Sequence, residues 1–308
     1  ANRSKVFVCI HAPSQYRRVL KRALVDRVKR EAAILKRLLK IGGESRMSYF
    51  ARFINIHSIP GSSESLVLEM EYAGIALTQE ALSNMDQMAR LSLAKQAAQV
   101  ISFFNTECEL EWVDCKLSNF LLDSFSIPGV QRLRAVDFGE SLRISGSTGW
   151  TREEIEAIPE SPRCSDGLTA EFCAPERWEA RSVGRTLAGT IHGDAWSLGV
   201  LFFMMFTGGK SLWGENVDEG DIIRLLQDNL RLAIQVEAKL HEVEAAYRPA
   251  RRVLEGLLQR LPGNRMTASH TLEHSLFNPG CTGVTKTIQE ALKEARRVTE
   301  ELRNHVDD

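Results

Sequence analysis

The sequence predicts an α+β protein of two lobes, a small one rich in strands followed by a large helical one. Near the N-terminus apolar residues recur with the two-residue period of a strand, whereas beyond Gly74 the pattern becomes helical. The change of character falls at Glu71-Tyr72-Ala73. We therefore expect one lobe over residues 1–73, a second over 74–280, and a helical extension over 281–308.

The elements of the first lobe follow from periodicity and from turn residues. Alternation over residues 6–11 predicts a strand. A long helix is expected from about Val19 to Lys40, with Gly42-Gly43 as its stop. Two further strands, over 50–59 and 66–70, are separated by a Pro-Gly-Ser-Ser turn.

The second lobe is expected to consist mainly of helices. A strong one is predicted from about Asp86 to Asn105. The apolar run from Leu198 to Phe206 suits a buried helix, because it is too short to cross a bilayer. From Val284 to Val306 apolar residues recur every three or four positions, as one stripe on a charged helix. This last helix is expected to pack back onto the large lobe, with partner binding as the alternative.

Composition excludes several classes of protein. Hydrophobic residues make up 44% of the chain and charged residues 26%, as in an ordinary globular protein. The formal net charge of −1 gives no general attraction to nucleic acid, and no apolar stretch predicts a transmembrane segment. The cysteines include no C-x-x-C pair, which argues against a metal site built from them: they are Cys9, Cys108, Cys115, Cys164, Cys173 and Cys281. A Cys164–Cys173 disulfide and fully reduced thiols remain open alternatives.

Three short motifs carry acidic residues in a fixed order. Asp114-Cys115-Lys116-Leu117-Ser118-Asn119 is followed by Asp137-Phe138-Gly139 and then by Ala174-Pro175-Glu176. The first motif combines an aspartate, a lysine and an asparagine, which suits chemistry on a polyanion. Oxygen ligands hold hard cations, and an ammonium group neutralises negative charge. The run Asp194–Gly199 and then Arg265 follow farther along the chain.

This ordered set resembles the protein kinase superfamily, and the resemblance covers residues 6–277. It implies a bilobal protein kinase-like fold and ATP-dependent phosphoryl transfer. Asp114 then corresponds to the catalytic base, and Lys116 to the lysine that steadies the transferring phosphate. Asn119 and Asp137 correspond to the Mg²⁺ ligands.

The resemblance also assigns structural and nucleotide-binding positions. Glu31 matches the glutamate of the helix that follows the third strand of a kinase small lobe. Glu176 is expected to form a buried ion pair with Arg265. The adenine would lie against Glu71-Tyr72-Ala73, with Met70 behind it.

One departure from the family pattern concerns the lysine that grips the nucleotide phosphates. Counting back from Glu31 by the usual separation places His11 at that position. Cys9, two residues earlier on the same strand, would share its face and line the adenine pocket. Histidine is shorter than lysine and mostly neutral at about pH 7, so it would hold phosphate poorly. Lys5 is the alternative, and it requires an unusually long connection to the helix.

Two further departures concern the catalytic loop and the phosphate lid. Trp112-Val113 replaces the usual histidine and arginine before Asp114, so a phosphate on the activation segment would lack its arginine partner. Trp112 is interpreted as a packing substitution. No G-x-G-x-x-G motif precedes His11, so the first lobe is predicted to be truncated, without a glycine-rich loop.

In lacking that loop, the chain resembles the with-no-Gly-loop, rhoptry-related kinases secreted by apicomplexan parasites, and most of all their degenerate bradyzoite pseudokinase branch. The resemblance implies a secreted protein of the parasitophorous vacuole or cyst wall. The preferred function is accordingly a pseudokinase that acts as a binding or scaffold module, with weak or absent phosphotransfer and weak Mg-ATP binding. The alternative is an active atypical Ser/Thr protein kinase without a glycine-rich loop.

A protein partner is expected for such a scaffold, and one segment is unusually basic. Between Arg17 and Lys40 there are ten Lys/Arg residues against two acids. A solvated helix face explains this excess. Docking of an acidic partner, or peripheral contact with anionic lipid, is the alternative.

Overall fold

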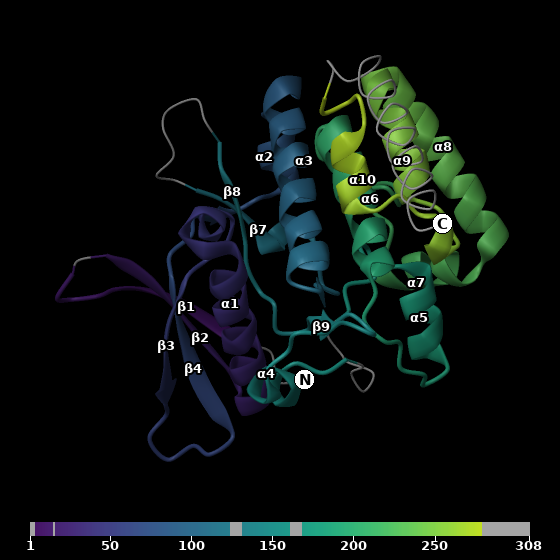
Figure 1. Cartoon of the computed structure of the whole chain (residues 1–308). Helices are drawn as coiled ribbons and strands as arrows, with labels where there is room; N and C mark the ends of the chain where they lie inside the picture. Colours follow the sequence, from purple (N-terminus) through teal and green to yellow (C-terminus); the bar gives the residue numbers. More distant parts are fainter. Residues whose placement is uncertain (1–3, 15, 124–130, 161–167, 279–308) are drawn as a thin grey trace, which may run out of the picture.

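The computed structural model describes residues 4–14, 16–123, 131–160 and 168–278. Figure 1 shows a smaller lobe of strands with the long helix α1 beside a larger lobe of helices. The mixed helix and sheet content agrees with the predicted class. The helix predicted over 284–306 lies outside the described residues and remains a prediction. Cys164 also lies outside them, but Cys173 is a free, buried thiol, which contradicts the alternative of a Cys164–Cys173 disulfide.

An antiparallel sheet forms the smaller lobe. Its strands lie in the spatial order β1-β2-β4-β3. In the register, Lys21 lies opposite Val6 on one neighbouring strand and Leu68 on the other. The absence of a glycine-rich loop stays a prediction. The strands are β1 (Lys5–Ile10), β2 (Arg17–Leu24), β3 (Phe53–Ser58) and β4 (Ser65–Glu71).

Residues 17–24 form a strand, so the prediction of a helix from Val19 was wrong. Lys21 and Ala23 are buried whereas Arg22 and Leu24 are exposed, the alternation of a strand. Helix α1 (Val25–Arg46) begins at the very next residue. Because no loop separates the strand from the helix, no turn residue marks where the two-residue period ends and the helical period begins.

Helix α1 covers one face of the sheet. Its side chains Ile34, Leu35 and Leu38 are completely buried and join the core that the sheet contributes to. The regular geometry breaks at Gly43, where φ is 58°. This is the place at which the sequence predicts the stop, because glycine adopts positive φ without steric cost.

The chain passes between the lobes directly after β4. Tyr72, Ala73 and Gly74 form this connection, and Ala73 is buried. Gly74 has φ of 126°, and a Cβ at this position would lie 1.9 Å from the carbonyl oxygen of Leu122. Only glycine fits there, so the backbone of the connection is fixed by close packing.

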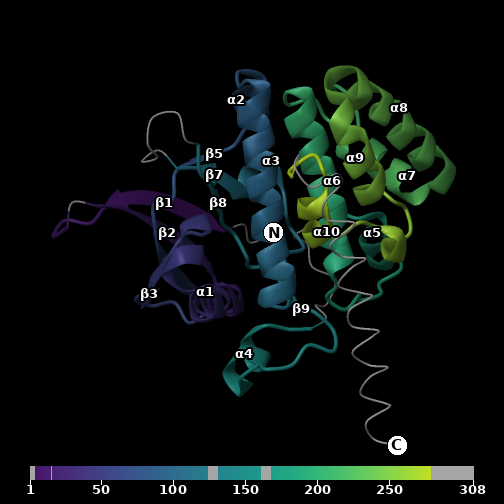
Figure 2. The ribbon, with the colours of Figure 1, turned by 45° about the horizontal axis from the view of Figure 1, so that its top comes forward.

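The larger lobe is built around α6 (Ile191–Thr207), which is buried continuously from Gly193 to Phe206. The predicted buried helix over 198–206 is therefore confirmed. Helix α3 (Gln87–Ser102) also matches its prediction, with the Asp86 carboxylate accepting from the Ala89 N–H as its N-terminal cap. In Figure 2, α3 lies between the smaller lobe and α6.

The remaining elements surround this pair. None of the described helices has the length and apolarity needed to cross a lipid bilayer. The helices are α2 (Gln79–Ser83), α4 (Arg152–Ala157), α5 (Pro175–Ser182), α7 (Glu219–Gln227), α8 (Asn229–Tyr247), α9 (Arg251–Leu257) and α10 (Ala268–Glu273). The short strands are β5 (Ile75–Ala76), β6 (Leu110–Glu111), β7 (Phe120–Leu122), β8 (Leu133–Ala135) and β9 (Leu142–Arg143).

Candidate active site

A lysine of the sheet sits between two carboxylates at the cleft between the lobes. The Nζ of Lys21 on β2 donates to Glu31 Oε2 at 2.7 Å and to Asp137 Oδ1 at 2.7 Å. The side chains of Lys21 and Glu31 are 8% and 2% exposed, so water screens this ion pair little. One cation thus joins the sheet, helix α1 and the Asp-Phe-Gly motif.

This arrangement contradicts the prediction that His11 occupies the lysine position. His11 lies in the exposed turn after β1, where its Nδ1 is 2.7 Å from Ser14 Oγ. Lys5 begins β1 and is exposed, so it does not take the position either. The prediction assumed the usual distance between lysine and glutamate. Because strand β2 runs straight into α1, Lys21 lies only ten residues before Glu31.

The register also places Cys9 away from the cleft. Val6 lies opposite Lys21, and side chains alternate along a strand, so Cys9 shares the other face. The prediction that Cys9 lines the adenine pocket is therefore wrong. Val19 shares the face of Lys21 instead, since it precedes Lys21 by two residues on the same strand, and it lies opposite the buried Met70.

The predicted catalytic carboxylate lies on the opposite side of a cleft of about 760 Å³. Lys116 Nζ donates to Asp114 Oδ2 at 2.5 Å, and Thr169 Oγ1 donates to Asp114 Oδ1 at 2.8 Å. Lys116 also reaches Thr169 Oγ1 at 3.2 Å. The three side chains hold one another in place. Thr169 was missed at the level of sequence, because nothing in the local pattern ties it to a motif more than fifty residues earlier.

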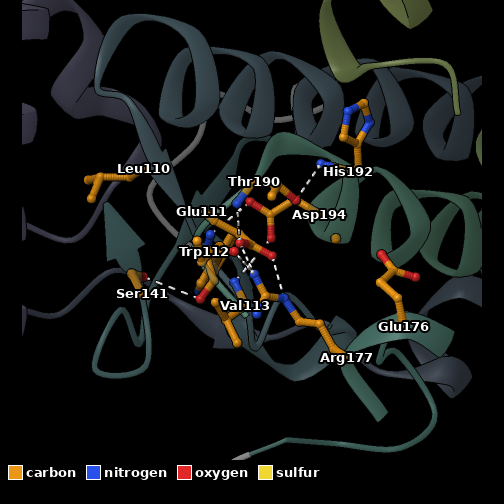
Figure 3. Close-up of polar contacts among 12 residues, drawn as sticks. Leu110, Glu111, Trp112, Val113, Ser141, Glu176, Arg177, Thr190, His192 and Asp194 are labelled. Atoms are coloured by element: carbon orange, nitrogen blue, oxygen red, sulfur yellow. Dashed lines mark hydrogen bonds and ion pairs between the residues drawn. The ribbon is translucent and has the colours of Figure 1, made fainter. Parts of the chain in front are cut away.

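Buried hydrogen bonds fix the backbone that carries Asp114. The N–H groups of Trp112 and Val113 donate to Asp194 at 2.7 and 3.0 Å, and Asp194 is completely buried on α6 (Figure 3). Val113 has φ of 72°, a conformation that is rare for a β-branched residue. The Asp194 carboxylate therefore stabilises a strained turn directly before the candidate base.

Trp112 does more than fill space, in contrast to the prediction of a packing substitution. Its indole Nε1 donates to the carbonyl oxygen of Asp137 at 3.0 Å. Its ring lies 5.1 Å from that of Phe138, and both side chains are completely buried. Asp137 itself has φ of 66°. The tryptophan thus holds the backbone that presents the Asp137 carboxylate to the cleft.

The protein kinase domain family matches residues 2–277. The chain belongs to the protein kinase family. It is similar to serine/threonine-protein kinase 17A of Oryctolagus cuniculus, with 27% identity over 248 residues, which covers 79% of this chain and 55% of that protein. Calcium-dependent protein kinase 19 of Arabidopsis thaliana is 27% identical over 179 residues, covering 58% of this chain and 27% of that protein. Calcium-dependent protein kinase 21 of the same plant is 26% identical over 271 residues, which covers 85% of this chain and 44% of that protein. The chain spans about half the length of these relatives or less.

The ionisable groups of this kinase site influence one another strongly. Burial alone would lower the pKa of Lys21, but the charges of Glu31 and Asp137 outweigh burial and raise it above its ordinary value. Burial raises the pKa of Glu31, with Lys21 opposing. At Asp137 the charge of Lys21 outweighs burial and holds the pKa below its ordinary value. Burial also raises the pKa of Asp114, against the charge of Lys116, as suits a group that accepts a proton.

The residues expected to hold Mg²⁺ have suitable chemistry. Asn119 donates its Nδ2 to the carbonyl oxygen of Asp114 at 2.9 Å, which leaves its amide oxygen as the acceptor. The pKa of Asp137 is low, so this carboxylate is ionised at neutral pH. Carboxylate and amide oxygens are ligands that Mg²⁺ accepts. The donor set therefore fits the cation that kinases use with ATP.

Two consecutive residues of α5, Glu176 and Arg177, each form a buried ion pair. Arg265 donates to both oxygens of Glu176 at 2.6 and 2.7 Å, which confirms the predicted pair. Arg177 forms a second pair with Glu111, which directly precedes Trp112, and its Nε lies 2.7 Å from Glu111 Oε1 (Figure 3). No local pattern indicates this pair, because its members are 66 residues apart and neither belongs to a motif.

The side chains at the connection between the lobes have different surroundings, and adenine binding there stays a prediction. Met70 and Ala73 are buried at the cleft side. Glu71 instead turns its side chain outward, where it lies 3.1 Å from Arg134. The guanidinium carbon of Arg17 lies over the Tyr72 ring, 5.5 Å from its centroid. The side chains of Glu71 and Tyr72 thus contact other residues of the chain.

Proposed function

We propose that this kinase domain is an active, ATP-dependent Ser/Thr protein kinase. The observation that carries the proposal is the position of Lys21, whose Nζ lies 2.7 Å from both Glu31 and Asp137. The pseudokinase prediction depended on a histidine at this place and on the absence of a glycine-rich loop, and the position of Lys21 removes the first of these premises. The names of the similar proteins support the same class of acceptor, since one is a serine/threonine-protein kinase.

In this function Asp114 accepts the proton of a serine or threonine hydroxyl. The hydroxyl oxygen attacks the γ-phosphorus of ATP, the bond to the β–γ bridging oxygen breaks, and ADP leaves. Thr169 and Lys116 keep the Asp114 carboxylate in one orientation. Lys116 also brings positive charge next to the transferring phosphoryl group, and Lys21 does so at the remaining phosphates.

When bound, Mg²⁺ neutralises phosphate charge during the transfer. Asp137 and Asn119 are the residues that would hold it. Because Trp112 fixes the backbone of Asp137 and Asp114 fixes the Asn119 amide, both ligands are held by contacts within the chain before any cation binds. Such preorganisation lowers the cost of assembling the site.

The test is phosphate transfer from Mg-ATP to a generic protein substrate by the wild type and three variants. Lys21→Met and Asp114→Asn should each lower the rate about a hundredfold or more, since each removes a preorganised charge. His11→Ala is the matched control and should leave the rate unchanged. Equal loss in His11→Ala and Lys21→Met would contradict the assignment of Lys21.

The scaffold function is the second candidate. Val113 supports it, because this residue leaves Asp114 without the neighbouring arginine that the family pattern places there. Mg-ATP binding to a wild type that transfers no phosphate would favour this alternative and end the first proposal. The resemblance to the with-no-Gly-loop kinases, and the secreted location and protein partner that it implies, stay predictions.

A further inference from the structure

Arg37 lies on α1, within the basic segment from Arg17 to Lys40 but outside the kinase motifs, and it is one of the most enclosed charges in the smaller lobe. Its side chain is 4% exposed. The Nε donates to the carbonyl oxygen of Cys108 at 3.0 Å, and the NH2 group lies 3.6 Å from Glu109. An arginine buried at this depth is retained only where several acceptors receive its donors.

The other contacts of Arg37 come from the activation segment. Its guanidinium carbon lies 3.5 Å from the ring centroid of Trp150, and its NH1 donates to Glu154 Oε1 at 3.3 Å. We call Arg37, Trp150 and Glu154 the α1 clamp. A guanidinium stacked on an indole and paired with a carboxylate is a strong and geometrically selective contact.

The activation segment holds its half of the clamp in place independently. Glu154 belongs to a capping box at the start of α4, in which the Thr151 N–H donates to Glu154 Oε2 at 2.8 Å. Trp150 donates its indole N–H to Ser147 Oγ at 2.9 Å. The hydrogen bonds to Thr151, followed by the charge of Arg37, outweigh burial and keep the pKa of Glu154 below its ordinary value. Both partners of Arg37 are thus preorganised.

The clamp acts on the same helix as Glu31. Two more basic residues of α1 bind the start of the activation segment: Arg27 lies 2.8 Å from Glu140, and Arg30 donates to the carbonyl oxygen of Gly139 at 3.1 Å. Three arginines of α1 therefore hold the helix against the activation segment. At these positions the basic residues of α1 form contacts within the chain.

We propose that Arg37 is a positioning residue for phosphoryl transfer, and that the α1 clamp holds Glu31 against Lys21 without a phosphate on the activation segment. The proposal rests on the proposed kinase function. Its second support is Val113, which stands where the family pattern has the arginine that binds such a phosphate. Unmodified residues of this chain then set the position of α1, through the contacts of Arg37 with Trp150, Glu154 and the backbone of Cys108.

The first test measures kcat and KM for ATP in Arg37→Met and Trp150→Leu, with Arg46→Met as the matched control. Arg46 lies on the same helix and also contacts an acid and an aromatic ring, Glu107 and Phe103, neither of which belongs to the activation segment. The clamp variants should lose about tenfold in kcat/KM, within the range typical of coupling between sites, and Arg46→Met should not.

A double variant separates positioning from a general loss of structure. If Arg37 acts through Lys21, adding Arg37→Met to Lys21→Met should cost little further activity, because the contact it supports is already gone. Fully multiplicative losses would overturn the proposal. Treating the wild type with a protein phosphatase should leave its rate within about twofold, whereas loss of tenfold or more would overturn independence from phosphorylation.

Hydrogen exchange of the α1 amides tests the clamp independently of enzyme activity. Exchange over residues 27–40 should be about tenfold faster in Arg37→Met and Trp150→Leu than in the wild type, and unchanged in Arg46→Met. This pattern in a wild type that transfers no phosphate would leave the clamp supported and end the proposed function. If the wild type is active, but Arg37→Met and Trp150→Leu change neither the exchange of α1 nor kcat/KM, the clamp alone is overturned.

Discussion

Glu111 is the group through which the stability of this kinase domain should depend on pH in an unusual direction. It is completely buried next to the catalytic loop, and it accepts from Arg177 Nε at 2.7 Å and from the Thr190 N–H at 2.6 Å. Burial raises the pKa of Glu111 to about 7, with the charge of Arg177 opposing and that of Asp194 adding to the rise. Replacing Glu111 by glutamine removes the titration and nearly keeps the shape.

The sign follows from proton linkage. In the unfolded chain the Glu111 carboxyl has its ordinary pKa of 4.5, so between 4.5 and about 7 the folded state binds more protons than the unfolded state. The free energy of unfolding therefore falls as the pH rises through this window. Each pKa unit corresponds to ~1.4 kcal/mol, so the contribution of Glu111 should fall by roughly 3 kcal/mol in total.

Urea denaturation of the wild type and Glu111→Gln at several pH values measures this difference. The other titrating groups, histidines included, are common to both proteins and cancel in the comparison. From about pH 4.5 to about pH 8, the glutamine variant should gain roughly 3 kcal/mol relative to the wild type. Glu107→Gln is the control, since Glu107 is 48% exposed and should show no such trend. A gap that stays constant, or moves the other way, would mean that Arg177 outweighs burial and that the reasoning fails.

Three further predictions address the core and the cleft. Arg265→Ala should leave the Glu176 carboxylate without its partner and lower the free energy of unfolding by roughly 3–5 kcal/mol; an unchanged melting temperature would contradict a structural role for the pair. Asp137→Ala should abolish the Mg²⁺-dependent part of ATP binding in calorimetry, and ATP binding of equal strength in EDTA would place the nucleotide elsewhere. Trp112→Phe loses the hydrogen bond to the Asp137 carbonyl and should lower kcat roughly fivefold, whereas an unaltered rate would reduce Trp112 to packing alone.

The sequence by itself determined the family and most of the chemistry. Roles for Asp114, Lys116, Asn119 and Asp137 could be predicted because these residues stand in short motifs that resemble those of protein kinases, whose phosphoryl transfer uses such groups. The buried helix over 198–206 was predictable for a similar reason, since its signal is a continuous apolar run that no other local structure explains. Both inferences use only short motifs or runs and their order along the chain.

Only the tertiary structure identified Lys21, the residue on which the proposal of an enzyme rather than a scaffold depends. The periodicity of a strand and that of a helix are both satisfied by the residues before Glu31, so only the pairing of β2 with β1 and β4 reveals that Lys21 points into the cleft. Thr169, Arg37 and the Glu111–Arg177 pair were hidden for the same physical reason. Each acts on a partner more than fifty residues away. Such contacts depend on how whole elements pack, and a local pattern carries no record of that packing.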